Sequence, residues 1–435
     1  MTPDSLPHHL SRLLGPDTGR LVLGFSGGLD SSVLLHALCR AGLTGRVLAV
    51  HVQHGLHPQA ETWCEHCAGV ARSLGVAFVV ERLTLAPGGN LEARARDARR
   101  AALLRHVDPA DTLLLAHHRQ DQVETLLLRL LRGAGARGLS AMAAEQHWQG
   151  RRLCRPLLAW DRSTLAQLAR DWGLAWISDP ANASLQFDRN YLRHRVWPVL
   201  DERWPQASER LHTSAAVLAE QAGLLDELAN EDYRHCDGSA DGCSLSLTGW
   251  LALSPARRRN LLHGWLRSRQ IRPPTAATLA RVEQELASAA ADRVPRVDWS
   301  EGAFCRYRER LWLLRPAALS PLSGEQVWAA PFPDLHWQGL RLSRHAQGAL
   351  RWRQLPETLV VRPARGGERL LWHGLHRQVS ELWRVAGVPP WQRRRLPLFY
   401  AADELVAVAG IGVADPWRAS PDDAGLSLAV EDSAL

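Results

Sequence analysis

The first third of the chain alternates short apolar runs with longer stretches whose apolar residues recur every three or four positions. The apolar runs predict four β-strands, at residues 21–25, 47–52, 76–80 and 112–116. The stretches between them, including 60–74 and 91–106, have the period of helices. Strands that are apolar throughout and separated by helices are typical of a parallel sheet covered on both faces. We therefore predict an α/β fold with a doubly wound parallel sheet in this part of the chain.

The remainder of the chain has weaker patterns that predict two further domains. A helix is expected at about 205–232, followed by a Gly- and Asp-rich linker at 236–242. Helices at 255–269 and 275–290, then a strand over 304–314, predict a mainly helical middle domain. Residues 316–354 are rich in Pro, Gly and Trp, and we expect a linker with some strand; the tail is expected to be a small α+β domain. The expected domains are 1–235, 245–320 and 355–420.

A glycine-rich turn follows the first predicted strand and precedes a run of good helix formers. Its residues are Ser26, Gly27, Gly28, Leu29, Asp30, Ser31 and Ser32. Two adjacent glycines let the backbone approach a ligand closely, and the amides of a turn and of a helix N-terminus form an anion site. Asp30 would repel a phosphate unless a divalent cation lay between them, so it is the expected Mg²⁺ ligand. An ordinary strand-to-helix turn is the alternative, but the full Ser-Gly-Gly-x-Asp-Ser string resembles the loop of the PP-loop ATP pyrophosphatases, which implies ATP binding.

Polar residues also follow the second and fourth predicted strands, and ligands of parallel sheets bind at these strand ends. His51 and His54 are expected to line the groove for adenine and ribose, although a histidine at a strand end is often only a structural hydrogen-bonding group. His117, Asp121 and Glu124 open the helix after the fourth strand, and the two acids share one face. The alternative for these acids is stabilisation of the helix dipole.

Two arginine-bearing segments are further candidates for anion binding. Arg96 and Arg99 share one face of the helix at 91–106, which suits an anion, although a solvated arginine face fits equally well. A polar loop beginning at Asp179 leads into a basic helix with Arg189, Asn190 and Arg193. A loop followed by a basic helix is a reasonable contact for a phosphodiester backbone.

The charge distribution indicates a polyanionic partner. The chain has a net charge of +7 and no lysine, so all 52 basic residues are arginine. The absence of lysine excludes Walker-type phosphate loops, Schiff-base chemistry and lysine adenylation. Residues 351–400 contain ten arginines but only three acidic residues, and four tryptophans are interleaved with the arginines. This composition is suited to binding RNA. The candidate RNA contacts there are Arg369, Arg393, Arg394 and Arg395.

The cysteines and the apolar runs bear on the cellular compartment. Seven cysteines, few for 435 residues and odd in number, are expected to be reduced, as in the cytoplasm. Cys64 and Cys67 could supply half of a zinc site with Cys236 and Cys243, but they lie in unrelated elements, which disfavours a metal there. No apolar run reaches the roughly 18 residues needed to span a membrane, and no signal-peptide core is present at the N-terminus.

A chain of motifs in fixed order resembles the tRNA(Ile)-lysidine synthetase family. These motifs are Ser-Gly-Gly-Leu-Asp-Ser at 26–31, His-Val-Gln-His-Gly-Leu at 51–56, Ala-His-His-x-x-Asp-Gln-Val-Glu-Thr at 116–125, Leu-Arg-Gly-Ala-Gly at 131–135, Ser-Asp-Pro-x-Asn at 178–182, Arg-Gly-Gly-Glu-Arg at 365–369 and a basic tail motif at 387–400. The resemblance implies that ATP adenylates the 2-carbonyl oxygen of the wobble cytidine in a tRNA-Ile with a CAU anticodon. The amine of free L-lysine then displaces AMP. On this resemblance Asp30, His117 and Arg96 are catalytic, Asp121 and Glu124 bind lysine, and a homodimer is compatible with the sequence.

Some positions depart from the family's pattern, and two other functions remain open. The family commonly has Tyr where Arg100 stands and Asn where Gln53 stands, and lysine-rich positions of the tail helix read Val-Ser-Glu-Leu-Trp-Arg at 379–384. A tRNA thiolase with the same loop is the nearest rival enzyme, and it would need cysteines near the nucleotide. An RNA-binding protein with an inactive nucleotide fold is the other alternative, but it would not need Asp30, His117 and Glu124 together.

Overall fold

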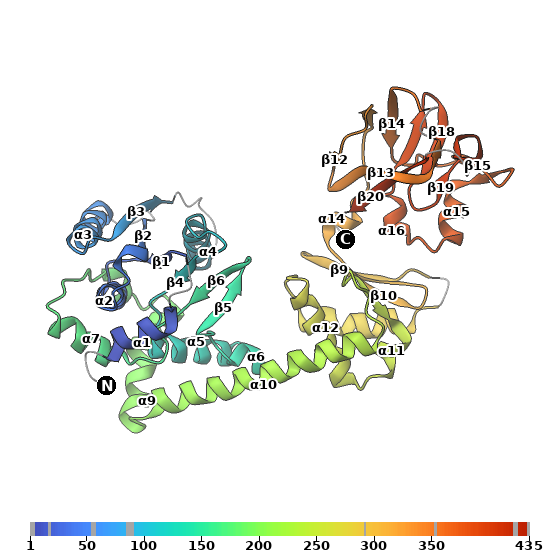
Figure 1. Ribbon diagram of the computed structural model, residues 1–435. Helices are drawn as coiled ribbons and strands as arrows, with labels where there is room; N and C mark the ends of the chain where they lie inside the picture. The colour runs from blue at the N-terminus through green and yellow to red at the C-terminus, as the bar shows by residue number, and fades with distance from the viewer. Residues whose placement is uncertain are drawn as a thin grey trace. The chain divides into compact units, whose positions relative to one another are not determined.

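The computed structural model describes residues 5–15, 19–53, 58–83, 91–290, 293–351, 355–420 and 425–432, without the side chains of 91–93, 96, 181, 182, 346 and 347. The chain divides into two compact units, Met1–Leu224 and Leu225–Leu435, and each is described by itself (Figure 1). No described helix is long and apolar enough to span a membrane. All seven cysteines are free thiols.

The first unit is built on a six-stranded sheet in the order β3-β2-β1-β4-β6-β5. Its strands are β1 (Leu21–Gly24), β2 (Val47–Gln53), β3 (Ala77–Arg82), β4 (Thr112–Leu114), β5 (Glu145–Trp148) and β6 (Arg151–Cys154). All neighbours are parallel except the β5–β6 hairpin at one edge. The four predicted strands and the parallel α/β class are confirmed.

Helices cover both faces of this sheet. The helices of the unit are α1 (Ser5–Leu14), α2 (Leu29–Arg40), α3 (Ala60–Ser73), α4 (Leu91–Leu104), α5 (Arg119–Leu131), α6 (Ala136–Leu139), α7 (Arg162–Asp171), α8 (Asp188–Tyr191) and α9 (Trp197–Arg203). Leu21 and Leu23 pack with α1, α2, α3 and α7, whereas Val22 packs on the other face with Leu103 of α4. This alternation along β1 is what a doubly wound sheet requires.

The strand order reverses at β1, which pairs with β2 on one side and with β4 on the other. Ligands of open α/β sheets bind outside the carboxyl ends of the strands at such a reversal. The loops after β1 and β4 therefore meet at the expected binding edge. A π-helical segment, η3 (Leu192–Val196), joins α8 to α9, and α10 (Ala207–His235) continues from the first unit into the second.

The first part of the second unit packs helices against the four-stranded antiparallel sheet β7-β10-β9-β8. Its elements are β7 (Ser244–Ser246), α11 (Leu247–Ala252), α12 (Pro255–Ser268), α13 (Ala276–Arg281), η4 (Val282–Leu286), β8 (Arg296–Trp299), β9 (Gly302–Tyr307) and β10 (Arg310–Leu314). The predicted helices are present. The single strand predicted over 304–314 is wrong: Arg308 adopts a φ of 55°, and the chain turns back there into the β9–β10 hairpin.

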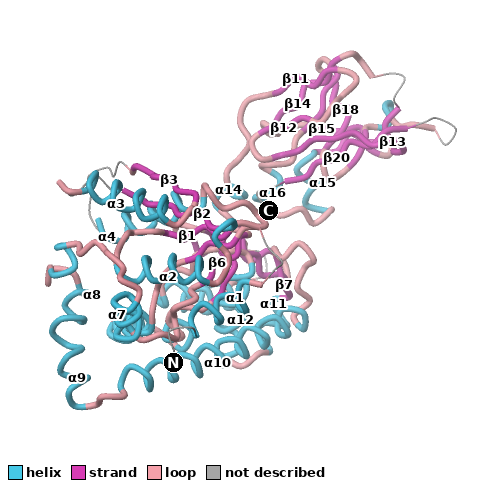
Figure 2. Tube along the Cα trace, turned by 60° about the vertical axis from the view of Figure 1, so that its left-hand side comes forward, coloured by secondary structure: helices cyan, strands magenta, loops and turns pink. Residues whose placement is uncertain are grey.

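The second part of this unit consists mainly of strands, as Figure 2 shows. Their pairs are antiparallel. Its elements are α14 (Pro316–Leu319), β11 (Gln326–Ala329), β12 (Leu335–Trp337), β13 (Leu340–Arg351), β14 (Thr358–Arg362), β15 (Arg369–Trp372), β16 (Leu375–Gln378), α15 (Val379–Val385), α16 (Pro390–Arg393), β17 (Leu398–Ala401), β18 (Glu404–Val408), β19 (Gly412–Val413) and β20 (Gly425–Asp432). The stretch 316–354 is not a linker: β11, β12 and β13 belong to the sheets, and Trp328, Trp337 and Leu342 are buried in the core. Its composition, rich in Pro, Gly and Trp, does not show the regular pattern that would have predicted these strands.

Arg395 holds several of these segments together. Its side chain is 4% exposed and ion-pairs through Nε with Asp432 at 2.5 Å. Nη1 donates to the carbonyl oxygens of Ala317 and Ser320, and Nη2 donates to the carbonyl oxygen of Gln338 and to Asp432. All five N–H donors of the guanidinium are thereby used inside the protein. The sequence-based expectation that Arg395 contacts RNA is not met, because no donor is left for a phosphate.

We expect Arg395→Met to lower the free energy of unfolding by about 3–5 kcal/mol, because it removes the buried guanidinium that pairs with the largely covered carboxylate of Asp432 and satisfies three carbonyl oxygens. Urea unfolding of the full chain, followed by tryptophan fluorescence, measures this. Adding Asp432→Asn should recover part of the loss. The neighbouring exposed residue gives a matched control, Arg394→Met, with a change within about 0.5 kcal/mol. Equal effects of the two methionine variants would contradict the role of Arg395.

Candidate functional site

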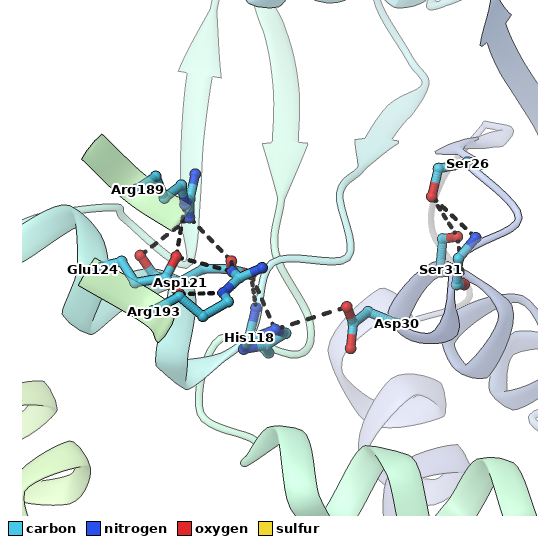
Figure 3. A network of polar contacts seen from close by, with 9 residues as sticks. Ser26, Asp30, Ser31, His118, Asp121, Glu124, Arg189 and Arg193 are labelled. Carbon is cyan, nitrogen blue, oxygen red and sulfur yellow. Dashed lines mark hydrogen bonds and ion pairs between the residues drawn. The ribbon is translucent and has the colours of Figure 1, made fainter. Parts of the chain in front are cut away.

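The loop after β1 has the geometry of a phosphate cradle. Gly27 has a φ of +76°, a conformation that glycine adopts at little cost. Ser31 Oγ lies 3.0 Å from Ser26 Oγ (Figure 3) and donates to the carbonyl oxygen of Gly28. Ser32 Oγ donates to the carbonyl oxygen of Gly27. Leu29 begins α2, so the backbone amides of the loop and of the helix N-terminus gather at one place.

Buried side chains support this loop from behind. A Cβ atom built on Gly27 would lie 2.6 Å from Ile177 Cδ1 and 2.7 Å from Cys67 Sγ. The amide of Ile177 donates to the carbonyl oxygen of Gly27. The His51 ring is 6% exposed, with Nδ1 3.0 Å from the carbonyl oxygen of Phe25. The structure therefore gives His51 a supporting contact, and its expected contact with the nucleotide stays a prediction.

The residues after β4 face Asp30 across the edge of the sheet. Nε2 of His118, a side chain that is 2% exposed, lies 3.7 Å from Asp30 Oδ2 and 3.5 Å from Asp121 Oδ2 (Figure 3). Burial, with Asp121 adding to it and His118 opposing it, raises the pKa of Asp30 above its usual value. Asp30 Oδ1 is buried and has no hydrogen-bond partner among the described residues. One carboxylate with an unused oxygen beside a phosphate cradle fits Mg²⁺, which usually takes one or two carboxylates together with phosphates and waters.

Asp121 and Glu124 form a buried ion cluster with two arginines. The carboxylates are 9% and 3% exposed. Arg189 donates to Glu124 at 2.7 Å and to Asp121 at 3.0 Å, and Arg193 donates to the same two acids at 2.6 and 3.2 Å (Figure 3). Although burial opposes the shift, the charges of His118 and Arg189 lower the pKa of Asp121 to about 2. Asp121 is thus held ionised, and the two arginines fix the position of both acids.

His117 adjoins this cluster and is neutral near pH 7. Burial lowers its pKa to about 4; the nearby Asp121 opposes the shift, and the charges of Arg155 and Arg189 add to it. Its Nδ1 is buried and lacks a hydrogen-bond partner in the part of the chain that the structure describes. A neutral imidazole with an unused nitrogen can accept a proton from a bound reactant.

The structure brings together Ser26, Asp30, Asp121 and Glu124 at one edge of the sheet. His54 lies outside the described residues, as does the side chain of Arg96. The three predicted RNA contacts Arg189, Asn190 and Arg193 all have partners inside the protein, Asn190 through the carbonyl oxygen of Ser184. Their contact with RNA stays a prediction.

The four predicted RNA contacts of the tail differ in exposure. Arg394 and Arg369 are exposed, and Arg369 also donates to the carbonyl oxygen of His376. Arg393 donates to the carbonyl oxygen of Val388 and to the hydroxyl of Tyr307. With Arg395 buried, Arg369 and Arg394 are the two exposed members of this set.

The sequence reasoning missed two residues at this edge. It chose His117 of the histidine pair, whereas His118 is the one that bridges Asp30 and Asp121. It also passed over Arg155, a buried arginine directly after β6. Its position after a strand of the same sheet was the available signal, but the short β5–β6 hairpin has no clear apolar pattern.

Substitution of the two loop glycines should have unequal effects. Gly27→Ala forces a left-handed φ on alanine and a clash with Ile177 and Cys67, and we expect a loss of about 1–3 kcal/mol in the free energy of unfolding. Gly28→Ala is the matched control, because Gly28 has a φ of −73° and its added Cβ would come no closer than 3.3 Å, to Ser26 Oγ. Thermal unfolding without nucleotide, followed by circular dichroism, compares them. Equal melting temperatures would show that the loop is not supported in this way.

Comparison with known proteins is consistent with this geometry. A family model described as a PP-loop domain matches residues 5–200, a TilS substrate-binding domain matches 245–312, and a TilS C-terminal domain matches 359–430. The tRNA(Ile)-lysidine synthase of Alkalilimnicola ehrlichii is 42% identical over 97% of this chain and 96% of its own length. The enzyme of Escherichia coli O157:H7 is 39% identical over 90% of this chain and 92% of its own length. That of Pseudomonas putida is 40% identical over 93% of this chain and 97% of its own length. The chain therefore belongs to the tRNA(Ile)-lysidine synthase family.

Proposed function

We infer that this protein is a ligase that forms lysidine on a tRNA at the expense of ATP. The observation that carries this inference is the position of the phosphate cradle in a member of this family. Asp30 of the cradle and Asp121 of the buried Asp121–Glu124 cluster lie on either side of His118 at one edge of the sheet. The cradle accounts for ATP use. The fixed carboxylates and the neutral His117 are suited to binding a second substrate that is cationic.

In the first step, the 2-carbonyl oxygen of the wobble cytidine in tRNA-Ile with a CAU anticodon attacks the α-phosphate of ATP. Pyrophosphate leaves, and the oxygen becomes part of an adenylate. The loop amides and Ser26 hold the phosphates, and Asp30 would hold Mg²⁺, which offsets the negative charge that develops on them. An amide-like carbonyl is a poor electrophile, and adenylation converts its oxygen into a leaving group.

In the second step, an amine of free L-lysine attacks C2 of the cytidine, and AMP leaves with that oxygen. Asp121 and Glu124 supply negative charge for the lysine ammonium groups, although both acids already accept hydrogen bonds from Arg189 and Arg193. The arginines fix the acids in place. His117, neutral near pH 7, accepts the proton that the attacking amine must lose. ATP, free lysine and tRNA occur together in the cytoplasm, where we place the enzyme.

A thiolase reaction is disfavoured by the two cysteines nearest the loop. Cys67 is fully buried behind Gly27, and burial raises its thiol pKa to about 12. Cys64 is also buried, and its pKa is raised for the same reason. Such thiols are protonated and poor nucleophiles near neutral pH. No cluster of three or more His, Cys, Asp or Glu side chains with the arrangement of a metal site occurs among the described residues.

Incubation with a tRNA-Ile transcript, ATP and radiolabelled lysine tests the proposed function, and we expect lysine transfer with equimolar AMP release. Asp30→Asn should lower the rate about 10³-fold or more, because it removes the ligand of the metal on the phosphates. Asp201→Asn, at an exposed position of α9, serves as the carboxylate control. No transfer by the wild-type protein would refute the proposed function, and unchanged turnover of Asp30→Asn would refute the role of Asp30.

We propose that the exposed arginines of the tail bind tRNA through its phosphates. Arg369→Gln combined with Arg394→Gln should weaken tRNA binding and reduce the slope of log affinity against log salt by about 0.7–0.9 for each phosphate that is no longer neutralised. Filter binding across a salt series measures both quantities. Arg170→Gln, at an exposed position of α7 where the arginine donates to Gln167, provides a surface control outside the two TilS domains. Unchanged affinity and slope in the double variant would place the tRNA contact elsewhere.

A further inference from the structure

Arg155 is a buried cation whose hydrogen-bonding capacity is not fully used. Its side chain is 4% exposed, and Nη1 donates to the carbonyl oxygen of Ala143 at 2.7 Å. Its Nε has no partner, and no carboxylate pairs with it, among the residues that the structure describes. Burying a charged group without a counter-ion is costly, so native proteins normally pair such groups. An arginine in this state is suited to an anion that is supplied from outside the chain.

The position of Arg155 is that of a substrate-binding residue. It follows the last residue of β6, and β6 runs parallel to β4, with Cys154 paired to Leu114. The amide of Leu115 donates to the carbonyl oxygen of Cys154. The chain therefore leaves both strands at the same carboxyl edge, where His117 follows β4. Two buried polar atoms without described partners, Arg155 Nε and His117 Nδ1, thus lie at neighbouring strand ends.

Charges of both signs act on His117. Burial lowers its pKa, Asp121 opposes that shift, and the positive charges of Arg155, Arg189 and Arg100 add to it. Arg100 is half-buried, and its guanidinium stacks over the ring of Trp148, 5.6 Å from the centroid. Arg100 is therefore a second cation that acts on His117, and an aromatic ring of the edge hairpin holds it in place. A ligand that carries both signs of charge matches such a site.

We propose that Arg155, assisted by Arg100, binds the α-carboxylate of the amino-acid substrate. This inference rests on the proposed function, in which Asp121 and Glu124 face the amines of that substrate. The carboxylate requires a cation that is not already engaged, and Arg189 and Arg193 donate to the two acids. A guanidinium binds a carboxylate through paired N–H groups, which gives orientation as well as attraction. The pair would make the enzyme select an amino acid over an amine of the same shape.

L-Lysine and L-lysinamide, which lacks the negative charge, test this assignment. Ligation of each to the tRNA transcript is measured for the wild-type protein and for Arg155→Gln. We expect the wild type to prefer lysine in kcat/KM by about 10- to 100-fold, the usual effect of a hydrogen-bonded charge. Arg155→Gln should lose most of this preference through a higher KM for lysine, with kcat/KM for lysinamide unchanged. Because the ratio is taken on one preparation, the folded fraction cancels.

Two further variants keep the test decisive. Arg152→Gln is the matched control on the same strand, because Arg152 pairs with Glu145 at the surface, and it should keep the wild-type preference. If Arg155→Gln does not fold, the half-buried Arg100→Gln should show a smaller loss of the same preference.

The outcomes that overturn the assignment are distinct from failure of the proposed function. Equal use of lysine and lysinamide by the wild type would overturn it, as would an unchanged preference in Arg155→Gln or, if that variant does not fold, in Arg100→Gln. An equal fall for both nucleophiles, with a shallower salt dependence of tRNA binding, would assign the arginine to an RNA phosphate instead. If the wild type transfers no lysine at all, the proposed function itself fails.

Discussion

The arrangement of the site depends on charges buried at the carboxyl edge of a parallel sheet. Asp121 and Glu124 lie on the first turns of α5 and are almost inaccessible to water, so they require counter-ions. Arg189 and Arg193 provide them from a segment more than sixty residues further along the chain. The same ion pairs therefore fix that segment against the sheet, and the charge of Arg189 helps to lower the pKa of Asp121 against the effect of burial. Loss of one partner would leave an uncompensated charge, which is why the cluster acts as a unit.

The ion cluster also sets the electrostatics of the neighbouring groups. His118 lies between Asp30 and Asp121 and separates two carboxylates that would otherwise repel each other. His117 remains neutral because burial lowers its pKa, a shift that Asp121 opposes and the charges of Arg155 and Arg189 reinforce. The sheet edge thus combines a phosphate cradle, fixed negative charge, a neutral base and the Nε of Arg155, which has no partner among the described residues. In the proposed function these groups would activate a carbonyl oxygen and deliver an amine to the same carbon.

A chain whose basic residues are all arginine uses them for two purposes. Some are exposed and suited to polyanions, as Arg369 and Arg394 are in the tail. Others are internal connectors: Arg395 joins the last strand to α14 and to the β12–β13 turn through five hydrogen bonds. Guanidinium suits both tasks because its planar set of five donors can satisfy several carbonyl and carboxylate oxygens at once. Charge content alone therefore does not identify an RNA-binding surface.

The sequence by itself determined the parallel α/β class, the phosphate loop with Asp30 and the family. The reason is that these features are local: continuous apolar strands, a glycine pair, and motifs of fixed spacing. Only the tertiary structure decided which charges are buried and which partners they meet. It turned Arg189 and Arg193 inward, buried Arg395, made sheet strands of the stretch 316–354, and placed Arg155 beside His117. Those outcomes depend on contacts between residues distant in the chain, and neither local pattern nor composition encodes which distant groups come into contact.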